Sequence, residues 1–225
     1  MSRIVAGPFN RVEGDLEITL ETGEDKVQRA EVNSPLYRGF ERILLGHKPM
    51  DALVYTPRIC GICSVTQSVA SARALADAMG LSMPKNGELC TNLVLASENI
   101  TDLITHFYLF FMPDFARDTY AGASWFGDIQ GRFKATAGSA ATQMLPARAD
   151  FLHLMGLMAG KWPHTLSLQP GGVAKAIEPK ERMRLLAIVA GFKRFLESTL
   201  FGDSLTTISQ LKSEAELWQW YQQKP

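Results

Sequence analysis

The feature of the sequence that most constrains its fold is a long apolar repeat with helical spacing. Apolar residues recur every three or four positions at Leu89, Leu93, Ala96, Ile100, Leu103, Phe107 and Phe111. This predicts a helix from about Leu89 that stops where Pro113 forbids its continuation. Similar but shorter patterns predict further helices from Ser64 as N-cap to Gly80 as C-cap, within 147–159, from Pro179 to Leu200, and from about Ser213.

Two alternating segments near the N-terminus predict an antiparallel hairpin. Leu16, Ile18 and Leu20 alternate with polar residues over 15–21, and the turn-like TGED leads to a second alternating run, VQRAEV. No alternation of strands with helices follows. The expected fold is mainly α with a small N-terminal antiparallel β hairpin, an α+β class. We expect one domain over 1–225, with the hairpin at about 4–34 and a helical body at about 35–225.

Charge and hydropathy exclude several classes of function. Lys and Arg together number 23, as do Asp and Glu, so no overall positive field is available to hold nucleic acid. No apolar run reaches the ~18 residues that a membrane span requires. Charges at Arg3, Arg11 and Glu13 interrupt the window in which a signal peptide needs an apolar core. We therefore expect a cytoplasmic protein, unless a partner exports it.

The three cysteines are Cys60, Cys63 and Cys90, and the first two form a Cys-x-x-Cys pair in the segment TPRICGICSVTQ. At this spacing both sulfurs can converge on one metal, and Gly61 permits a tight path between them. The start of the next helix is expected to lower the thiol pKa values. The spacing alone leaves three interpretations open: a metal half-site, a redox dithiol, or two incidental buried thiols. Cys90 lies in a helical pattern and is expected to be structural.

Three segments carry a more specific signal: FNRVEGDLEITLE at 9–21, PLYRGFERILLGHKPMDALVYTPRICGIC at 35–63, and GKWPHTLSLQPGGV at 160–173. In order and spacing they resemble the large subunit of nickel-iron hydrogenases. The Arg-x-Cys-Gly-x-Cys element is preceded at the expected distance by an Arg-Gly-Phe-Glu element, residues 38–41. The resemblance implies the nickel-iron hydrogenase large-subunit fold and, in a complete subunit, conversion of H₂ to two protons and two electrons.

The resemblance also implies roles for individual residues. Cys60 would be a terminal nickel ligand and Cys63 would bridge nickel and iron, which suits soft thiolates. Glu13 would accept the proton released by heterolytic cleavage of H₂. Glu41 would bind a separate Mg²⁺ or iron ion through hard carboxylate oxygens. Asp114 would be an acidic residue near the active site, by a weaker match.

Further expectations concern cofactors, partners and neighbouring residues. The resemblance implies CO and CN ligands on the iron, and a small-subunit partner whose iron-sulfur clusters carry electrons away. Arg58 is expected to neutralise thiolate charge, whereas His106 and His164 are expected to be structural. Without the resemblance, the alternative for Glu13 is a solvated charge at a strand edge, and for Glu41 a residue on the surface of a helix. The PGGV turn at 170–173 is expected to use the positive φ that glycine permits.

Two residues depart from the family pattern. Asp15 and Gln67 stand where most members have histidine. A glutamine at the second position is a mark of regulatory hydrogenases, which report H₂ to a histidine kinase. Residue 67 lies one helical turn beyond Cys63, where an amide can donate a hydrogen bond toward sulfur but cannot take up a proton at neutral pH. We therefore assign Glu13, Arg58 and Gln67 to the catalytic surroundings and favour a regulatory H₂ sensor.

The sequence contains no second Cys-x-x-Cys pair, although the family places one near the C-terminus of a longer chain. The exposed-looking aromatic run ELWQWYQQKP also ends abruptly. We expect the N-terminal portion of a larger subunit, with the C-terminal part absent. The alternatives are a catalytic uptake hydrogenase, a metal-free fragment that acts as a docking or assembly module, and a zinc or iron half-site shared between two chains.

Overall fold

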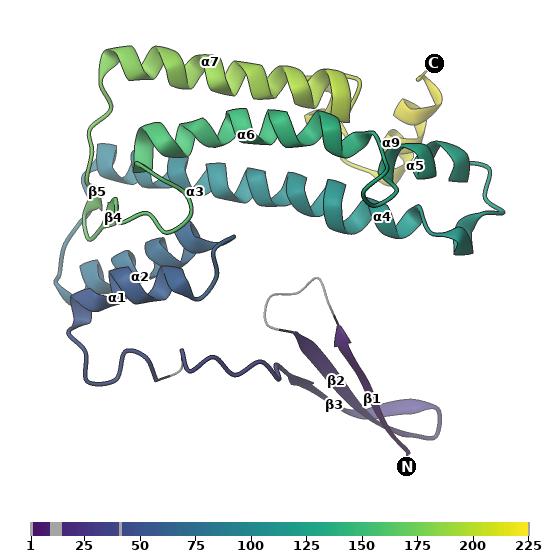
Figure 1. Ribbon diagram of the computed structural model, residues 1–225, viewed down its shortest axis with the longest axis horizontal. Coiled ribbons are helices and arrows are strands. Elements are labelled where there is room, and N and C mark those ends of the chain that lie inside the picture. Colours follow the sequence, from purple (N-terminus) through teal and green to yellow (C-terminus); the bar gives the residue numbers. More distant parts are fainter. Residues whose placement is uncertain (1, 10–14, 41, 225) are drawn as a thin grey trace.

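The computed structural model describes residues 2–9, 15–40 and 42–224 and shows a helical body with a small sheet at the N-terminal end (Figure 1). The main helices are α2 (Ser64–Ala78), α3 (Lys85–Thr105), α5 (Phe126–Phe133), α6 (Ala140–Ala159), α7 (Pro179–Phe195), α8 (Leu205–Gln210) and α9 (Glu214–Gln222). The short helical turns are η1 (Pro49–Asp51), α1 (Ala52–Tyr55), η2 (Thr56–Arg58), α4 (Met112–Phe115) and η4 (Asp118–Tyr120), and the π-helical segments are η3 (His106–Phe111) and η5 (Leu196–Leu200). The expected mainly helical α+β fold is confirmed.

The N-terminal sheet has three antiparallel strands in the order β1 (Ser2–Phe9), β2 (Leu16–Gly23) and β3 (Lys26–Asn33). The predicted hairpin corresponds to β2 and β3, and the predictions did not include β1 as a strand. Ile4 pairs with Leu20, and Leu20 with Ala30, so the sheet has one apolar face. Ile4 and Val32 nevertheless remain 48% and 72% exposed. The sheet lies to one side of the helical body (Figure 1).

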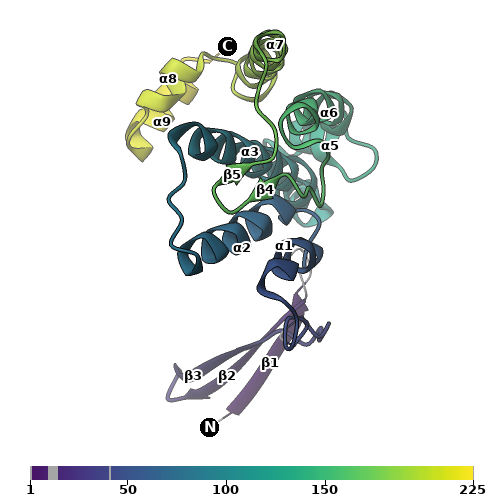
Figure 2. The same cartoon turned by 90° about the vertical axis from the view of Figure 1, so that its left-hand side faces the viewer.

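The core lies between α3, α6 and α7. Figure 2 shows α6 and α7 nearly end-on, with α3 running obliquely beside them. The Phe151 ring on α6 stacks on Phe192 of α7, with centroids 4.2 Å apart. Met144 and Met155 of α6 are fully buried, as expected for flexible side chains that fill irregular gaps. Among the described helices, none has the length and apolar character that a bilayer span requires.

Two predicted helix boundaries are wrong. The helical path of α3 continues through the π-helical η3 and ends at Phe115, two residues beyond Pro113. The wider π turn precedes the proline, which lies within the first turn of α4, where its missing N–H costs little. The helix expected within 147–159 begins at Ala140 and includes Pro146, so its packing against α3 and α7 outweighs the local penalty of the proline.

The predicted use of positive φ by the glycines of the PGGV turn is confirmed. The turn joins the short strands β4 (Leu168–Gln169) and β5 (Gly172–Val173). Gly171 and Gly172 have φ values of +94° and +141°. The hairpin packs its backbone directly on the first turn of α3. A Cβ on Gly87 would lie 2.8 Å from the Gly171 carbonyl oxygen, so only glycine fits at that crossing.

We predict that Gly87→Ala destabilises the protein by roughly 1–3 kcal/mol, because the added methyl must displace backbone atoms rather than a flexible side chain. Gly156→Ala in α6 is the matched control, since a Cβ there meets no atom within 4 Å. That control should stabilise the protein by about 0.5–1 kcal/mol. Equilibrium unfolding of both variants measures the difference, and equal stability of the two would contradict the close crossing.

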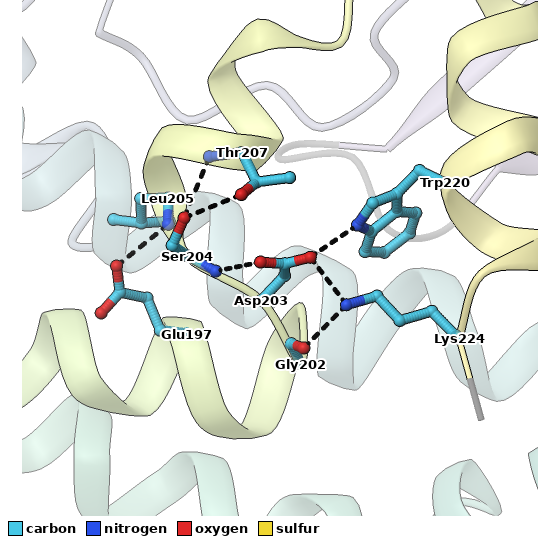
Figure 3. A network of polar contacts seen from close by, with 8 residues as sticks. All are labelled: Glu197, Gly202, Asp203, Ser204, Leu205, Thr207, Trp220 and Lys224. Carbon is cyan, nitrogen blue, oxygen red and sulfur yellow. Dashed lines mark hydrogen bonds and ion pairs between the residues drawn. The ribbon is translucent and has the colours of Figure 1, made fainter.

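The C-terminal segment folds back onto the loop between η5 and α8 through one aspartate (Figure 3). Asp203 accepts hydrogen bonds from the Trp220 indole at 3.0 Å and from the Ser204 backbone N–H at 2.7 Å, and it pairs with Lys224 at 2.8 Å. The helix beginning near Ser213 is confirmed as α9, with Ser213 as its N-cap. Trp218 and Tyr221 on the same helix remain 57% and 62% exposed.

We predict that Asp203→Asn at pH 7 loosens α9. The lysine ion pair, the indole and the backbone N–H hold the pKa of Asp203 below its usual range. The stabilisation is therefore present above the unfolded-state pKa of about 4 and is lost as the pH falls further. Amide hydrogen exchange over 214–224 should accelerate in the variant but not in the surface control Asp77→Asn on α2. Unchanged exchange in Asp203→Asn would show that Asp203 does not hold α9 in place.

Candidate functional site

The two cysteines of the Cys-x-x-Cys pair lie between η2 and α2. Cys60 is 6% exposed, and Cys63 is half-buried at the N-cap position of α2. Both are free thiols, and Cys60 lies close enough to Cys63 to shift the pKa of its thiol. The pair thus presents two neighbouring soft donors at the start of a helix, as half of a thiolate metal site requires.

The first turn of α2 is held by a carboxylate from another helix. Glu98 of α3 accepts the backbone N–H groups of Val65 at 2.8 Å and of Thr66 at 2.9 Å. Ser64, expected to be the N-cap, is instead the first helical residue, and no cap hydrogen bond comes from the side chain at the N-cap position. That prediction is wrong because Glu98 supplies the acceptor that a local N-cap side chain usually provides.

The segment that follows α6 closes the other side of the pair. The His164 backbone N–H donates to the Ser64 hydroxyl at 3.1 Å, and its Nδ1–H donates to the Pro57 carbonyl at 2.9 Å. His164 is thus hydrogen-bonded structurally, as expected. Gly61 does not have positive φ. A Cβ at Gly61 would lie 3.8 Å from the His164 ring, so the predicted need for glycine's conformational freedom is not observed.

The expected lowering of the thiol pKa by the helix start is wrong for Cys63 in the metal-free protein. Burial, followed by the hydrogen bond with Cys60 and the charges of Cys60 and Glu98, raises the pKa of Cys63 to about 11. The Gln67 amide opposes this by lowering it. The Glu98 carboxylate accepts the free N–H groups at the start of α2 and offsets the partial positive charge there. Little of that charge therefore acts on the Cys63 sulfur.

Gln67 and Arg58 have different relations to the cysteines. The Gln67 side-chain amide donates to the Cys63 sulfur at 3.7 Å, one turn along the same helix face, as the spacing predicted. Arg58 has an exposed side chain, and its carbonyl accepts a long hydrogen bond from Arg38 at 3.4 Å. Arg38 also donates to the Ile59 carbonyl at 2.6 Å. The Arg-Gly-Phe-Glu element therefore contacts the cysteine segment through its arginine, and neutralisation of thiolate charge by Arg58 stays a prediction.

Several predicted residues lie elsewhere. Glu13 and Glu41 lie outside the described residues, so their assigned roles stay predictions. Asp114 is a half-buried residue of α4, 16 residues and roughly 24 Å along the helical path from Glu98. The structure therefore does not bring it to the cysteine pair. His106 packs against the Phe111 ring, with centroids 6.4 Å apart, and Cys90 is partly buried against the core.

The predictions missed Glu98 because they assigned the wrong face of α3 to the core. In this chain the apolar stripe remains open, with Leu93 51% and Leu103 69% exposed. The buried face carries small and polar residues together with two apolar ones: Thr91, Val94, Ser97, Glu98, Thr101 and Ile104. A usable signal was present, since an acidic residue among Ser and Thr at helical spacing indicates a face with internal hydrogen bonding.

Comparisons with known proteins identify similar chains among the nickel-dependent hydrogenases. A family model described as nickel-dependent hydrogenase matches residues 38–122, which include both cysteines. The chain is 30% identical over 190 residues to the periplasmic [NiFeSe] hydrogenase large subunit of Desulfomicrobium baculatum, covering 77% of this chain and 36% of the relative. It is 28% identical over 224 residues to the hydrogenase-2 large chain of Escherichia coli K12, covering 78% and 40%.

The fold is also similar to that of a solved structure. The Ni-Fe-Se hydrogenase from D. vulgaris Hildenborough aligns with a TM-score of 0.70 at 28% identity, covering 88% of this chain and 43% of that one. The fold is a helical scaffold that presents two neighbouring thiols, Cys60 and Cys63, at the start of α2. In sequence and in fold the chain is similar to the large subunits of nickel-dependent hydrogenases. It spans less than half the length of these relatives.

We predict that Cys63 in metal-free protein reacts with iodoacetamide at pH 8 on the order of tenfold more slowly than an unstructured peptide thiol, because little of it is thiolate. The rate should rise as the pH approaches 11, since the pKa of Cys63 is raised to about that value. Gln67→Leu should slow the reaction further by removing the amide that lowers this pKa. Peptide-level mass spectrometry measures the rates, and reaction at the ordinary peptide rate would contradict the raised pKa.

Proposed function

We propose that this chain supplies two thiolates of a nickel-iron centre, and that the complete protein cleaves H₂ heterolytically into protons and electrons. The observation that carries the proposal is the pair of adjacent thiols of Cys60 and Cys63, inside the segment matched by the nickel-dependent hydrogenase model. Among the described residues, no group of three or more His, Cys, Asp or Glu side chains could hold an ion alone. The proposal therefore takes the remaining ligands from outside the described residues.

The residues of this chain have distinct roles in the proposal. Cys60 would be a terminal nickel ligand and Cys63 a bridge to iron, and both thiols suit such ions. When bound, the nickel-iron centre, with CO and CN on its iron, supplies the chemistry that splits H₂. Glu13 would accept the resulting proton, and Glu41 would bind Mg²⁺ or iron. The cytoplasmic location stays a prediction that cell fractionation tests.

The proposal also requires a partner, because electrons must leave a buried centre through a chain of carriers. We infer a small subunit that carries iron-sulfur clusters, and the names of the relatives, large subunit and large chain, support this. Apolar side chains exposed on this chain, such as Leu45 at 73% and Met183 at 67%, give surface for the continuation of the subunit and its partner to cover.

A second candidate is a regulatory H₂ sensor that signals to a histidine kinase. The observation that favours it is Gln67, whose amide donates to the Cys63 sulfur where most family members have histidine. An amide cannot relay protons at neutral pH as an imidazole can. The relatives include uptake enzymes, such as the uptake hydrogenase large subunit of Bradyrhizobium diazoefficiens, 36% identical over 107 residues. Their names support the catalytic alternative.

We predict that Cys63→Ser in the protein as its host makes it abolishes nickel and iron retention, because a hydroxyl cannot replace a bridging thiolate. Cys90→Ser is the matched control, since Cys90 lies on α3 with its side chain packed against the core, and its metal content should remain unchanged. Elemental analysis of both purified variants measures the outcome. Stoichiometric nickel in Cys63→Ser would overturn the assigned role, and absence of nickel from the wild type would favour a metal-free docking module.

We predict slow H₂ turnover together with specific binding of a histidine kinase if the sensor assignment is right. Turnover is measured with an artificial electron acceptor, and kinase binding by co-purification from the host. Rapid turnover without kinase association would instead identify a catalytic uptake enzyme in which Gln67 is incidental.

A further inference from the structure

Glu98 is a buried acidic side chain to which the proposed reaction assigns no role. It is 2% exposed in the middle of α3. Across 2–9, 15–40 and 42–224, no lysine or arginine forms an ion pair with it. Burying a carboxylate is costly unless hydrogen bonds replace its water. Its retention in this position therefore needs a specific set of donors.

Those donors come from two segments that flank the cysteines. One oxygen accepts the Val65 backbone N–H at 2.8 Å and the Trp162 indole N–H at 2.9 Å. The other accepts the Thr66 backbone N–H at 2.9 Å and the Thr66 hydroxyl at 3.0 Å. A single carboxylate therefore links α3 to the start of α2 and to the segment after α6.

We call the segment 59–63, between η2 and α2, the cysteine turn. These links fix its two ends. Cys63 directly precedes the helical turn that Glu98 holds, so a shift of that turn moves its sulfur. On the Cys60 side, His164 holds the Pro57 carbonyl and, through its backbone N–H, the Ser64 hydroxyl. Trp162, two residues earlier, is held by Glu98. Both ends of the turn thus depend on a network in which Glu98 is the central acceptor.

We propose that Glu98 is a positioning residue for the cysteine pair, which holds the two sulfurs at a metal-binding separation before any metal is bound. It acts through the backbone of α2 and is not a ligand. The identification of nickel as the metal that the pair binds rests on the proposed function. The positioning itself is a property of the metal-free chain and can be measured without nickel.

The test uses Glu98→Ala and Glu98→Gln in a Cys90→Ser background of the full protein, produced without nickel. The probe is phenylarsine oxide, whose arsenic forms two As–S bonds with a closely spaced thiol pair and releases water. Peptide-level mass spectrometry follows the adduct that joins Cys60 and Cys63. Ser97→Ala is the matched control, because Ser97 is equally buried on α3 but donates only to the Leu93 carbonyl of its own helix. Circular dichroism establishes that each variant is folded at the temperature of measurement.

We expect Glu98→Ala to weaken arsenical binding by about 10–100-fold, the range found when supports of metal ligands are removed. Glu98→Gln should have an intermediate effect, because its amide keeps one acceptor oxygen but turns a donor toward other donors. Ser97→Ala should bind as the wild type does. Where Glu98→Ala does not fold, Glu98→Gln decides. Wild-type affinity in a folded Glu98 variant, or an equal loss in Ser97→Ala, would overturn the proposal.

A second readout is the nickel content of the same variants, purified with nickel supplied. The proposal expects occupancy to fall in the order wild type, Glu98→Gln, Glu98→Ala, with Ser97→Ala unchanged. Full occupancy in Glu98→Ala would overturn the positioning role even where the proposed function stands. A nickel-free wild type would instead defeat the proposed function, and the arsenical affinities would still decide the role of Glu98.

Discussion

The arrangement of the cysteines depends on one carboxylate that accepts the first free N–H groups of α2. A helix start has unpaired N–H groups and a partial positive charge, and both are usually satisfied by a local N-cap side chain. Here Glu98 reaches them from α3, so the same contact caps α2 and joins two helices. It also withdraws the positive helix end from the Cys63 thiol, which is why burial prevails and the pKa of that thiol is raised.

The helices could be predicted because periodicity and helix-end residues are local signals. Pro179 begins α7 and Ser213 caps α9 as expected, and the β2–β3 hairpin follows its alternation. The buried face of α3 could not be predicted in the same way. A count of apolar residues favours the side with Leu93 and Leu103, whereas packing buries the side with Ser97, Glu98 and Thr101. Which face is covered depends on contacts from distant segments.

Only the part of the candidate site that is formed by residues close in sequence could be predicted. Cys60, Cys63 and Gln67 are close in sequence, so one turn of backbone brings them together. Glu98, Trp162 and His164 are brought to that turn only by tertiary folding. The exposed apolar faces of α3 and of the N-terminal sheet fit a chain that spans 43% of the similar solved structure, in which further polypeptide is available to cover them.

The account depends on the two sulfurs at Cys60 and Cys63 holding a metal together. The most direct measurement is an anomalous diffraction map, collected at the nickel absorption edge, from crystals of the protein as its host makes it. The account predicts one nickel peak within bonding distance of both sulfurs, with the Glu98 carboxylate directly behind the first turn of α2. Crystals with no nickel peak at this pair, or with nickel bound to other residues, would contradict it.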